Sequence, residues 1–282
     1  KEFKKKPISA YESLYRDDMN STLAMIAYTR GLAFKKLGKS TDALESFKLA
    51  VDVSKMEDLS VIPDYLAALA GSGKSKEALD LAKQLKGEAK SNPKLDSLIS
   101  VFYIAQNGSD SGLKELMTSL NKKAEEVVAG KLKKELLDYP ASDFTLMDLN
   151  GQEVSLSKLK GKTVVIDFWA TWCGPCLASF PTLKKAVEKY ASNPDVVFLF
   201  VNAWENVKDK KKNATDFITK NSYPFHVLLD EKDKVITDYE VSGIPTKFVI
   251  SKNGKVRFES VGFEDNEELL LKELDMMIEM AK

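Results

Sequence analysis

The only two cysteines of this 282-residue chain stand two residues apart, in the segment Cys173-Gly174-Pro175-Cys176. The apolar residues 164–170 before this segment predict a buried strand, and residues 177–190 after it predict a helix. Two cysteines at a strand-to-helix junction can close a small disulfide ring, and the unpaired N–H groups at a helix N-terminus stabilise a thiolate. This arrangement favours redox chemistry.

Zinc binding is the main alternative use of a Cys-x-x-Cys pair. A structural zinc site usually takes four Cys or His ligands, and this chain offers two cysteines and one histidine, His226. We therefore expect no metal site, and we expect His226 to be an ordinary strand or loop residue. Two cysteines in a single motif also do not suggest the disulfide scaffold of a small secreted domain.

Length and charge narrow the class of protein further. A chain of 282 residues exceeds the usual size of one domain, so we expect two domains. Lys plus Arg and Asp plus Glu number 42 each, and this balance gives no net field to attract nucleic acid or a membrane surface. No stretch approaches the ~20 apolar residues of a membrane span. The chain starts at Lys1 and not at Met, which indicates a processed or trimmed product, so the lack of a signal peptide leaves the compartment open.

The first 138 residues predict an all-helical domain with an internal repeat. The segment 38–44 recurs 35 residues later at 73–79, and a shorter copy begins at Gly108. We interpret each Gly-Lys/Ser segment as the turn of a helical hairpin that buries its apolar face on the next hairpin. The first unit resembles the tetratricopeptide pattern, with small and large packing residues at Gly31, Phe34, Ala43, Phe47 and Ala50. An irregular helical bundle is the alternative.

A change of pattern near Pro140 predicts the domain boundary. We expect Pro140 to end a helix over 131–138, after which the apolar period changes from 3.6 to 2. The predicted domains are residues 1–138 and 139–282. In the second domain Asn150-Gly151 predicts a hairpin turn. The other expected elements are strands at 144–146, 154–156, 164–170, 196–203, 226–229, 247–250 and 256–261, and helices at 177–190, 208–221, 235–241 and 267–281.

Two separated motifs in the second domain resemble the thioredoxin signature. The first is 167–176 (Asp-Phe-Trp-Ala-Thr-Trp-Cys-Gly-Pro-Cys), which Pro181 follows in the next helix. The second, Gly243-Ile244-Pro245-Thr246, resembles the loop that in thioredoxins holds a cis-proline beside the dithiol. With the hairpin at 144–156, the chain resembles more narrowly the TlpA/ResA-like thiol–disulfide oxidoreductases. The resemblance covers residues 141–282 and implies an α/β thioredoxin fold, with a central mixed sheet flanked by helices and an extra N-terminal β-hairpin.

The resemblance also implies roles for individual residues. Cys173, at the exposed end of the helix N-terminus, is expected to attack a target disulfide, and the shielded Cys176 to resolve the mixed disulfide. Asp167 is expected to be a buried, unpaired carboxyl of raised pKa that exchanges a proton with Cys176. The alternative for Asp167 is a strand-end residue that reaches solvent or caps a neighbour. ResA-like proteins often carry a Glu where this chain has Ser179, and this departure moves the proton role toward Asp167.

The expected substrate-binding residues surround the dithiol. They are Trp172, Gly174, Pro175, Ile244 and Pro245. In its cis form, Pro245 places the backbone of Ile244 to pair with an extended substrate segment, as the resemblance implies. Trp169 is expected in the core, whereas Trp204 either rims the site or covers the core.

These residues predict a thiol–disulfide oxidoreductase that reduces disulfides in protein or peptide substrates and takes electrons from an upstream thiol donor. We expect no metal or organic cofactor and no nucleic acid. The resemblance implies a bacterial, extracytoplasmic protein that is soluble or tethered to a membrane by a removed N-terminal segment. The alternatives are a helical adaptor with an accessory thioredoxin domain, and a disulfide oxidase or isomerase. Because the helical domain has no Cys or His, we expect it to bind partners and to do no chemistry.

Overall fold

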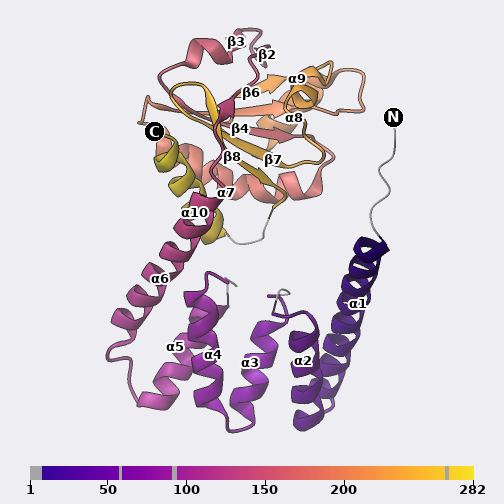
Figure 1. Ribbon diagram of the computed structural model, residues 1–282, viewed down its shortest axis with the longest axis vertical. Coiled ribbons are helices and arrows are strands. Elements are labelled where there is room, and N and C mark those ends of the chain that lie inside the picture. Colours follow the sequence, from indigo (N-terminus) through magenta and orange to yellow (C-terminus); the bar gives the residue numbers. More distant parts are fainter. Residues whose placement is uncertain (1–7, 57–58, 91–93, 264–266) are drawn as a thin grey trace. The chain divides into compact units, whose positions relative to one another are not determined.

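The computed structural model describes residues 8–56, 59–90, 94–263 and 267–282 (Figure 1). The chain divides into two compact units, Lys1–Val127 and Val128–Lys282. The domain boundary expected between residues 138 and 139 stays a prediction.

Helices make up the described part of the first unit, as the sequence predicts. They are α1 (Ile8–Lys36), α2 (Ser40–Val53), α3 (Ile62–Gly71), α4 (Ser75–Gly87), α5 (Leu95–Asn107) and α6 (Leu113–Lys134), the last of which continues past Val127. From α1 to α5, each helix contacts the next along the chain (Figure 1). Their buried faces share one apolar cluster, with Phe47, Leu66, Leu85 and Ile99 among its members. Helices that pack in sequence order on a shared core are what a series of helical hairpins requires.

The 35-residue repeat places a glycine after the ends of three helices. Gly38, Gly73 and Gly108 follow the ends of α1, α3 and α5, and their φ angles are 71°, 84° and 73°. This is the left-handed region that residues with a Cβ rarely adopt. Gly31 has a different reason, because a Cβ there would lie 2.6 Å from the ring of Phe47. The repeat therefore reflects turn geometry, and membership of the tetratricopeptide family stays a prediction.

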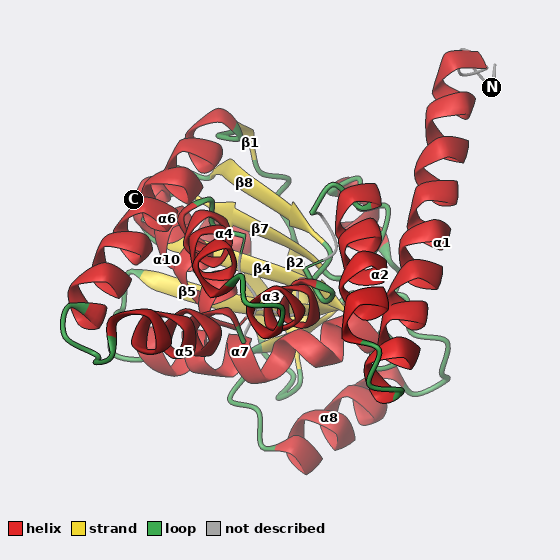
Figure 2. Cartoon of the chain, turned by 90° about the horizontal axis from the view of Figure 1, so that it is seen from below, coloured by secondary structure: helices red, strands yellow, loops and turns green. Residues whose placement is uncertain are grey.

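The second unit contains a mixed sheet whose described strands follow the order β1-β8-β7-β4-β5-β6-β2-β3. The neighbours β4, β5 and β6 are parallel, and the other pairs are antiparallel. Figure 2 shows β8, β7, β4 and β5 side by side in this order. The strands are β1 (Tyr139–Pro140), β2 (Thr145–Asp148), β3 (Glu153–Ser155), β4 (Thr163–Trp169), β5 (Val196–Asn202), β6 (Val227–Leu229), β7 (Thr246–Ile250) and β8 (Lys255–Val261).

Helices flank this sheet, and the extra hairpin β2–β3 precedes its central strands, which confirms the expected fold class. The helices are the 3₁₀ turn η1 (Leu156–Leu159), α7 (Gly174–Tyr190), α8 (Lys210–Asn221), α9 (Lys234–Asp238) and α10 (Glu267–Ala281). Cys173 directly precedes α7 and Cys176 lies in its first turn, at the strand-to-helix junction that the sequence predicts.

The alternation of side chains along β4 places Asp167 on the face of the sheet that α7 covers. Phe168 belongs to an apolar cluster that also contains Ile236 of α9. Trp169 points to the opposite face and is fully buried there, with its ring 5.1 Å from that of Phe180 in α7. Because successive side chains of a strand point to opposite faces, Asp167 shares the α7 face with Trp169. The core position expected for Trp169 is confirmed.

The predicted helix over 131–138 is wrong at its C-terminal end. The helix α6 ends at Lys134, and the N–H of Leu137 donates to the carbonyl of Arg257 at 2.9 Å. Asp138 pairs with Lys255 at 2.7 Å and also with Arg257. These contacts draw the chain onto β8, where Tyr139–Pro140 pairs as β1. Pairing with the sheet therefore ends the helix before Pro140 is reached.

Candidate active site

The two cysteines lie at the N-terminus of α7 and form a disulfide bond. Cys173 is the N-cap residue, and its Sγ accepts a hydrogen bond from the backbone N–H of Cys176 at 3.2 Å. Gly174 and Pro175 form the exposed first turn, where the missing N–H of proline breaks no helical hydrogen bond. The helix N-terminus thus directs an N–H group at the Cys173 sulfur, which is the arrangement that stabilises a thiolate.

Burial distinguishes the two cysteines less than the sequence predicts. Cys176 is fully buried, and Cys173 is only 3% exposed, so the expectation of an exposed Cys173 is wrong for this disulfide form. One cause is the carbonyl oxygen of Ile244, which lies 3.6 Å from Cys173 Sγ. Trp172, the residue directly before Cys173, is 55% exposed.

The loop before β7 brings the second predicted motif to the dithiol. The Ile244–Pro245 peptide bond is cis, as predicted. Pro245 is buried and Ile244 is half-buried. The contact of the Ile244 carbonyl with Cys173 joins two segments 71 residues apart in the chain. The fold thus assembles both sequence motifs into one site.

Asp167 is buried in β4, as predicted, but the expectation that it is unpaired is wrong. Its register partner on β7 is Lys247, whose Nζ lies 3.3 Å from Asp167 Oδ1. Both residues are buried, and apart from this ion pair no described residue donates a hydrogen bond to either carboxylate oxygen. Burial raises the pKa of the Asp167 carboxyl, and the charge of Lys247 opposes part of that rise. The available sequence signal for the pair was a lysine directly before the apolar residues 248–250.

Ser179 provides no acid near the dithiol. It is fully buried in α7, and its hydroxyl donates to the carbonyl of Cys176 at 2.7 Å. The side chain is thus used within the helix, and it has no proton that titrates near neutral pH. Asp167 remains the acidic residue that the sequence predicts for this site.

A buried carboxylate that the sequence reasoning missed lies beside the dithiol loop. Glu205 accepts hydrogen bonds from the N–H and the hydroxyl of Thr171, at 2.6 and 2.9 Å. It also accepts from the side-chain amides of Asn202 at 2.9 Å and Asn213 at 3.2 Å. Donors of this kind stabilise a buried charge, and Thr171 stands two residues before Cys173. The network therefore fixes the backbone that leads into the dithiol, and an acidic residue just past an apolar strand was its sequence signal.

Trp204 takes both of the roles considered for it. Its side chain packs against the apolar cluster on the α9 face of the sheet. Its carbonyl oxygen accepts a hydrogen bond from the indole N–H of Trp172 at 2.9 Å. The residue therefore covers the core and also holds the exposed side chain beside the dithiol.

His226, which was expected to be an ordinary strand or loop residue, lies apart from the residues around the dithiol. It is exposed, and its Nε2 lies 3.5 Å from Asp148 Oδ2. Asp148 in turn accepts the backbone N–H groups of Asn150 and Gln152 in the β2–β3 turn. Across the described ranges of the chain, three or more His, Cys, Asp or Glu side chains do not gather as a metal site would require. Among the described helices, none combines the length and the apolar character needed to cross a membrane.

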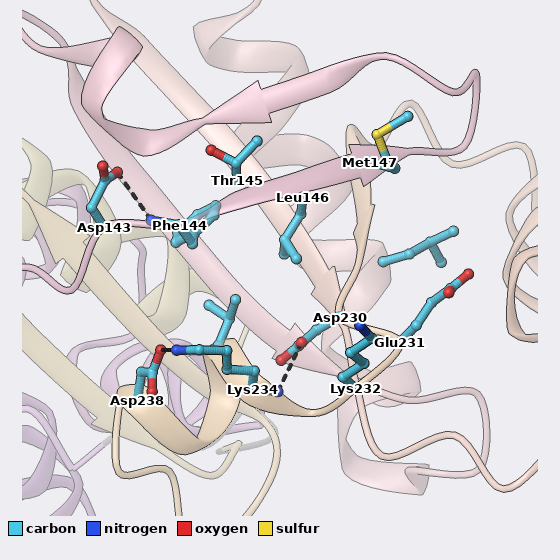
Figure 3. Close-up of a pocket in the computed structure, with 12 residues that line it drawn as sticks. Asp143, Phe144, Thr145, Leu146, Met147, Asp230, Glu231, Lys232, Lys234 and Asp238 are labelled. Atoms are coloured by element: carbon cyan, nitrogen blue, oxygen red, sulfur yellow. Dashed lines mark hydrogen bonds and ion pairs between the residues drawn. The ribbon is translucent and has the colours of Figure 1, made fainter.

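A cavity of about 550 Å³ lies between β2 and the loop that joins β6 to α9 (Figure 3). Three of its carboxylates, those of Asp143, Asp230 and Asp238, are engaged in holding the fold. Asp143 accepts the N–H of Phe144, and Asp230 accepts the N–H of Lys234. The Lys234 ammonium pairs with Asp238. None of the predicted site residues lines the cavity, so it adds no catalytic group to the site.

Comparison with known proteins identifies the family. The Redoxin family model matches residues 137–276. A thiol-disulfide oxidoreductase ResA from Geobacillus thermodenitrificans is 38% identical over 117 residues, which cover 42% of this chain and 64% of that protein. ResA from Bacillus anthracis is 34% identical over 129 residues, which cover 46% of this chain and 72% of that protein. Among solved structures, the exposed lipoprotein thioredoxin Etrx1 of Streptococcus pneumoniae is 31% identical, with a TM-score of 0.42, and covers 48% of this chain and 98% of that one.

A helix N-terminus that carries a dithiol, next to a cis-proline loop and a mixed sheet, defines a thioredoxin-fold protein. Within that class, the chain belongs to the thioredoxin superfamily, among its ResA-like thiol–disulfide oxidoreductases. The match spans a little less than two thirds of the Geobacillus relative. The helical unit, residues 1–127, lies outside the part that the Redoxin model matches.

Proposed function

We propose that this chain is a thiol–disulfide oxidoreductase that reduces disulfide bonds in protein or peptide substrates. One observation carries the proposal: the Cys173–Cys176 disulfide caps α7, with the Ile244 carbonyl of the cis-proline loop 3.6 Å from Cys173 Sγ. An adaptor protein has no need of such a dithiol, so the site favours an enzyme. The Gly-Pro pair between the cysteines resembles that of reducing thioredoxins, which favours reduction over oxidation.

The reaction uses the reduced form of the pair. The Cys173 thiolate attacks one sulfur of the target disulfide, forms a mixed disulfide and releases the other target sulfur as a thiolate. The Cys176 thiolate then attacks Cys173 Sγ, closes the Cys173–Cys176 disulfide and frees the second target sulfur. Two electrons pass to the target, which leaves as a dithiol. An upstream thiol donor reduces the pair again.

We assign the proton of the second step to Asp167. Before attack, the Cys176 thiol must lose its proton, and a carboxylate on the same face of the sheet as α7 can accept it. The support is the burial of Asp167, its raised pKa and its ion pair with Lys247. Burial raises the pKa of the Asp167 carboxyl, and the positive charge of Lys247 opposes part of that rise.

We assign substrate docking to the surface around Cys173. Trp172, Gly174 and Pro175 are exposed beside the sulfur, and these residues offer apolar contact to a partner. The backbone of Ile244, next to the cis Pro245, offers peptide groups to an extended substrate segment. The support for these roles is their position on both sides of one sulfur atom.

We further propose that the helical unit binds a protein partner and that the protein acts outside the bacterial cytoplasm, tethered to the membrane or free. The resemblance to TlpA/ResA-like proteins supports this compartment. The helical unit supports a binding role because helical hairpins in series present a continuous surface. The proposed functional boundary between the helical domain and the catalytic domain stays at residues 138 and 139.

Reduction of insulin by dithiothreitol, followed as turbidity, tests the proposed activity. The full chain should accelerate the reaction, and the variant with both Cys173→Ser and Cys176→Ser should not. A folded chain with a titratable dithiol but no activity would favour the adaptor. The midpoint potential of the dithiol separates the remaining alternative, because a potential near that of thioredoxin supports a reductase and one near that of DsbA supports an oxidase.

A further inference from the structure

The backbone of Trp204 adopts an uncommon conformation next to the dithiol loop. Its φ angle is +55°, in the left-handed region that is favourable for glycine and rare for a bulky aromatic residue. Such a conformation persists only where the surroundings impose it.

A hydrogen bond to the Asp233 side chain holds the backbone of Trp204. The Trp204 N–H donates to Asp233 Oδ1 at 2.7 Å. Asp233 lies in the loop between β6 and α9, its own N–H donates to the carbonyl of Asp230 at 3.0 Å, and its carboxylate lies 3.8 Å from Lys210 Nζ. The carboxylate thus ties the segment after β5 to the segment after β6. Because β5 and β6 are parallel, both segments lie at the same edge of the sheet.

The conformation presents the Trp204 carbonyl to the dithiol loop. That oxygen accepts the indole N–H of Trp172 at 2.9 Å, while the Trp172 residue remains 55% exposed. The next residue, Glu205, holds the N–H and the hydroxyl of Thr171. The two residues before Cys173 therefore form hydrogen bonds with two consecutive residues after β5. An exposed tryptophan would otherwise sample several rotamers.

We infer that Asp233 is a positioning residue that acts through the Trp204 backbone to hold Trp172 in one orientation for a docking protein substrate. The inference rests on the proposed function and names a residue that sets its selectivity. A preorganised aromatic side chain loses less entropy when a partner covers it. The predicted effect is therefore on large substrates, which contact Trp172, and not on a small disulfide that reaches Cys173 alone.

The test compares variants on oxidised insulin and on oxidised glutathione. Asp233→Ala should raise KM for insulin about fivefold, the effect of one lost hydrogen bond, with a much smaller change in KM for glutathione. Asp233→Asn keeps a carbonyl oxygen and should restore the KM for insulin. Lys232→Ala changes the exposed residue next to Asp233 and leaves the acceptor, so it is the control and should behave as the wild type.

A double-mutant cycle separates positioning from general loss of structure. In a Trp172→Phe background the indole donor is gone, so Asp233→Ala should change KM for insulin by less than about twofold. Independent, multiplying effects of the two substitutions would overturn the inference. Hydrogen exchange of the indole N–H gives a second readout, because the chain has three tryptophans and the Trp172 signal is assigned from the Trp172→Phe protein. Unchanged protection of that N–H in Asp233→Ala would equally overturn it.

Two further variants serve if Asp233→Ala does not fold. Trp204→Gly and Trp204→Val both lose the ring, but only glycine adopts a φ of +55° freely. The glycine protein should keep the Trp172 indole protected and the valine protein should lose it, and equal protection in both would contradict the inference. If the wild type reduced neither substrate, the proposed function would fail, whereas indole exchange would still decide whether Asp233 holds Trp172.

Discussion

Lys247 Nζ lies 3.3 Å from Asp167 Oδ1, between register partners on the neighbouring strands β7 and β4. Both residues are buried, and no further described donor reaches the carboxylate. An ion pair at this depth offsets the desolvation of its two charges but leaves each charge dependent on the other. The acid proposed for proton transfer therefore depends on a cation 80 residues away in the sequence.

Removal of that cation should destabilise the protein in a pH-dependent way. Lys247→Met leaves the Asp167 charge uncompensated, and breaking a buried pair costs about 3–5 kcal/mol near neutral pH. The folded-state pKa of Asp167 is raised above its unfolded value. Its ionisation therefore lowers stability as pH rises from about 3.9, the unfolded pKa, to the folded pKa, and the loss stays constant above that.

Urea unfolding of the oxidised proteins between pH 4 and pH 9 measures this effect. The loss of stability in Lys247→Met should shrink as pH falls toward 4. The matched control is Lys252→Met, which removes a lysine from the exposed pair with Asp195 at 2.9 Å and should change stability by less than about 1 kcal/mol. A deficit in Lys247→Met that is the same at all pH values would mean that the lysine acts by packing alone.

Asp167→Asn should slow resolution of the mixed disulfide more than its formation. The amide cannot accept the Cys176 proton, whereas the first attack by Cys173 needs no group at residue 167. Rapid acid quench followed by mass spectrometry measures both steps, and general-base removal should slow resolution by about 10²-fold or more. Asp195→Asn, which changes an exposed aspartate, is the control. Equal rates of resolution in Asp167→Asn and the wild type would remove Asp167 from the mechanism.

The two cysteines should differ in the adducts that they form. Cys173 Sγ receives the Cys176 N–H and lies at the Ile244 carbonyl, while Cys176 is fully buried. Cys176→Ser should therefore accumulate a stable mixed disulfide on Cys173 after incubation with an oxidised peptide, and Cys173→Ser should accumulate almost none. Intact-mass spectrometry reads the adducts directly. A stable adduct on the Cys173→Ser protein would reverse the two roles.

Glu205→Gln should loosen the approach to the dithiol. The carboxylate accepts four hydrogen bonds from neutral donors, and an amide replaces one acceptor oxygen with an NH₂ group that faces donors. We expect a loss of about 2 kcal/mol in the free energy of unfolding, the scale for a charge-assisted hydrogen bond. Chemical denaturation measures it, with the exposed Glu231→Gln as the control. Stability equal to that of the control protein would show that Glu205 is replaceable.

Removal of the helical unit should weaken the activity on a protein substrate more than the activity on a small disulfide. Leu137 and β1 pair with β8, so a fragment of residues 128–282, the second compact unit, retains these contacts. This fragment should reduce oxidised glutathione nearly as fast as the full chain and act more weakly on its natural protein substrate. If a folded fragment lost its activity on glutathione, the helical unit would have to contribute to the chemistry.

Local features of the sequence predicted much of this molecule. Gly38, Gly73 and Gly108 indicated helical turns because glycine adopts the left-handed backbone there without the steric cost of a Cβ. The Cys173-to-Cys176 segment between an apolar run and a helix placed the dithiol at a helix N-terminus. These predictions succeeded because the physical cause lies within a few residues.

Features that depend on distant partners were missed or wrong. The pairing of Lys247 with Asp167 follows from strand register, and the network of Glu205 follows from how the β5–α8 segment meets the dithiol loop. The helix expected to reach residue 138 ends at Lys134 because β8 offers Leu137 a backbone partner. In each case the deciding contact spans more than 30 residues, so no local pattern contains it.

The outermost strands of the sheet, β1 and β3, have only two and three residues, and one of those two in β1 is Pro140. Proline has no N–H to offer to another chain, and so short a strand gives a foreign strand little to pair with. The edges of the sheet thus resist intermolecular strand addition. An extended segment of a proposed substrate therefore finds little to pair with at these two outermost strands.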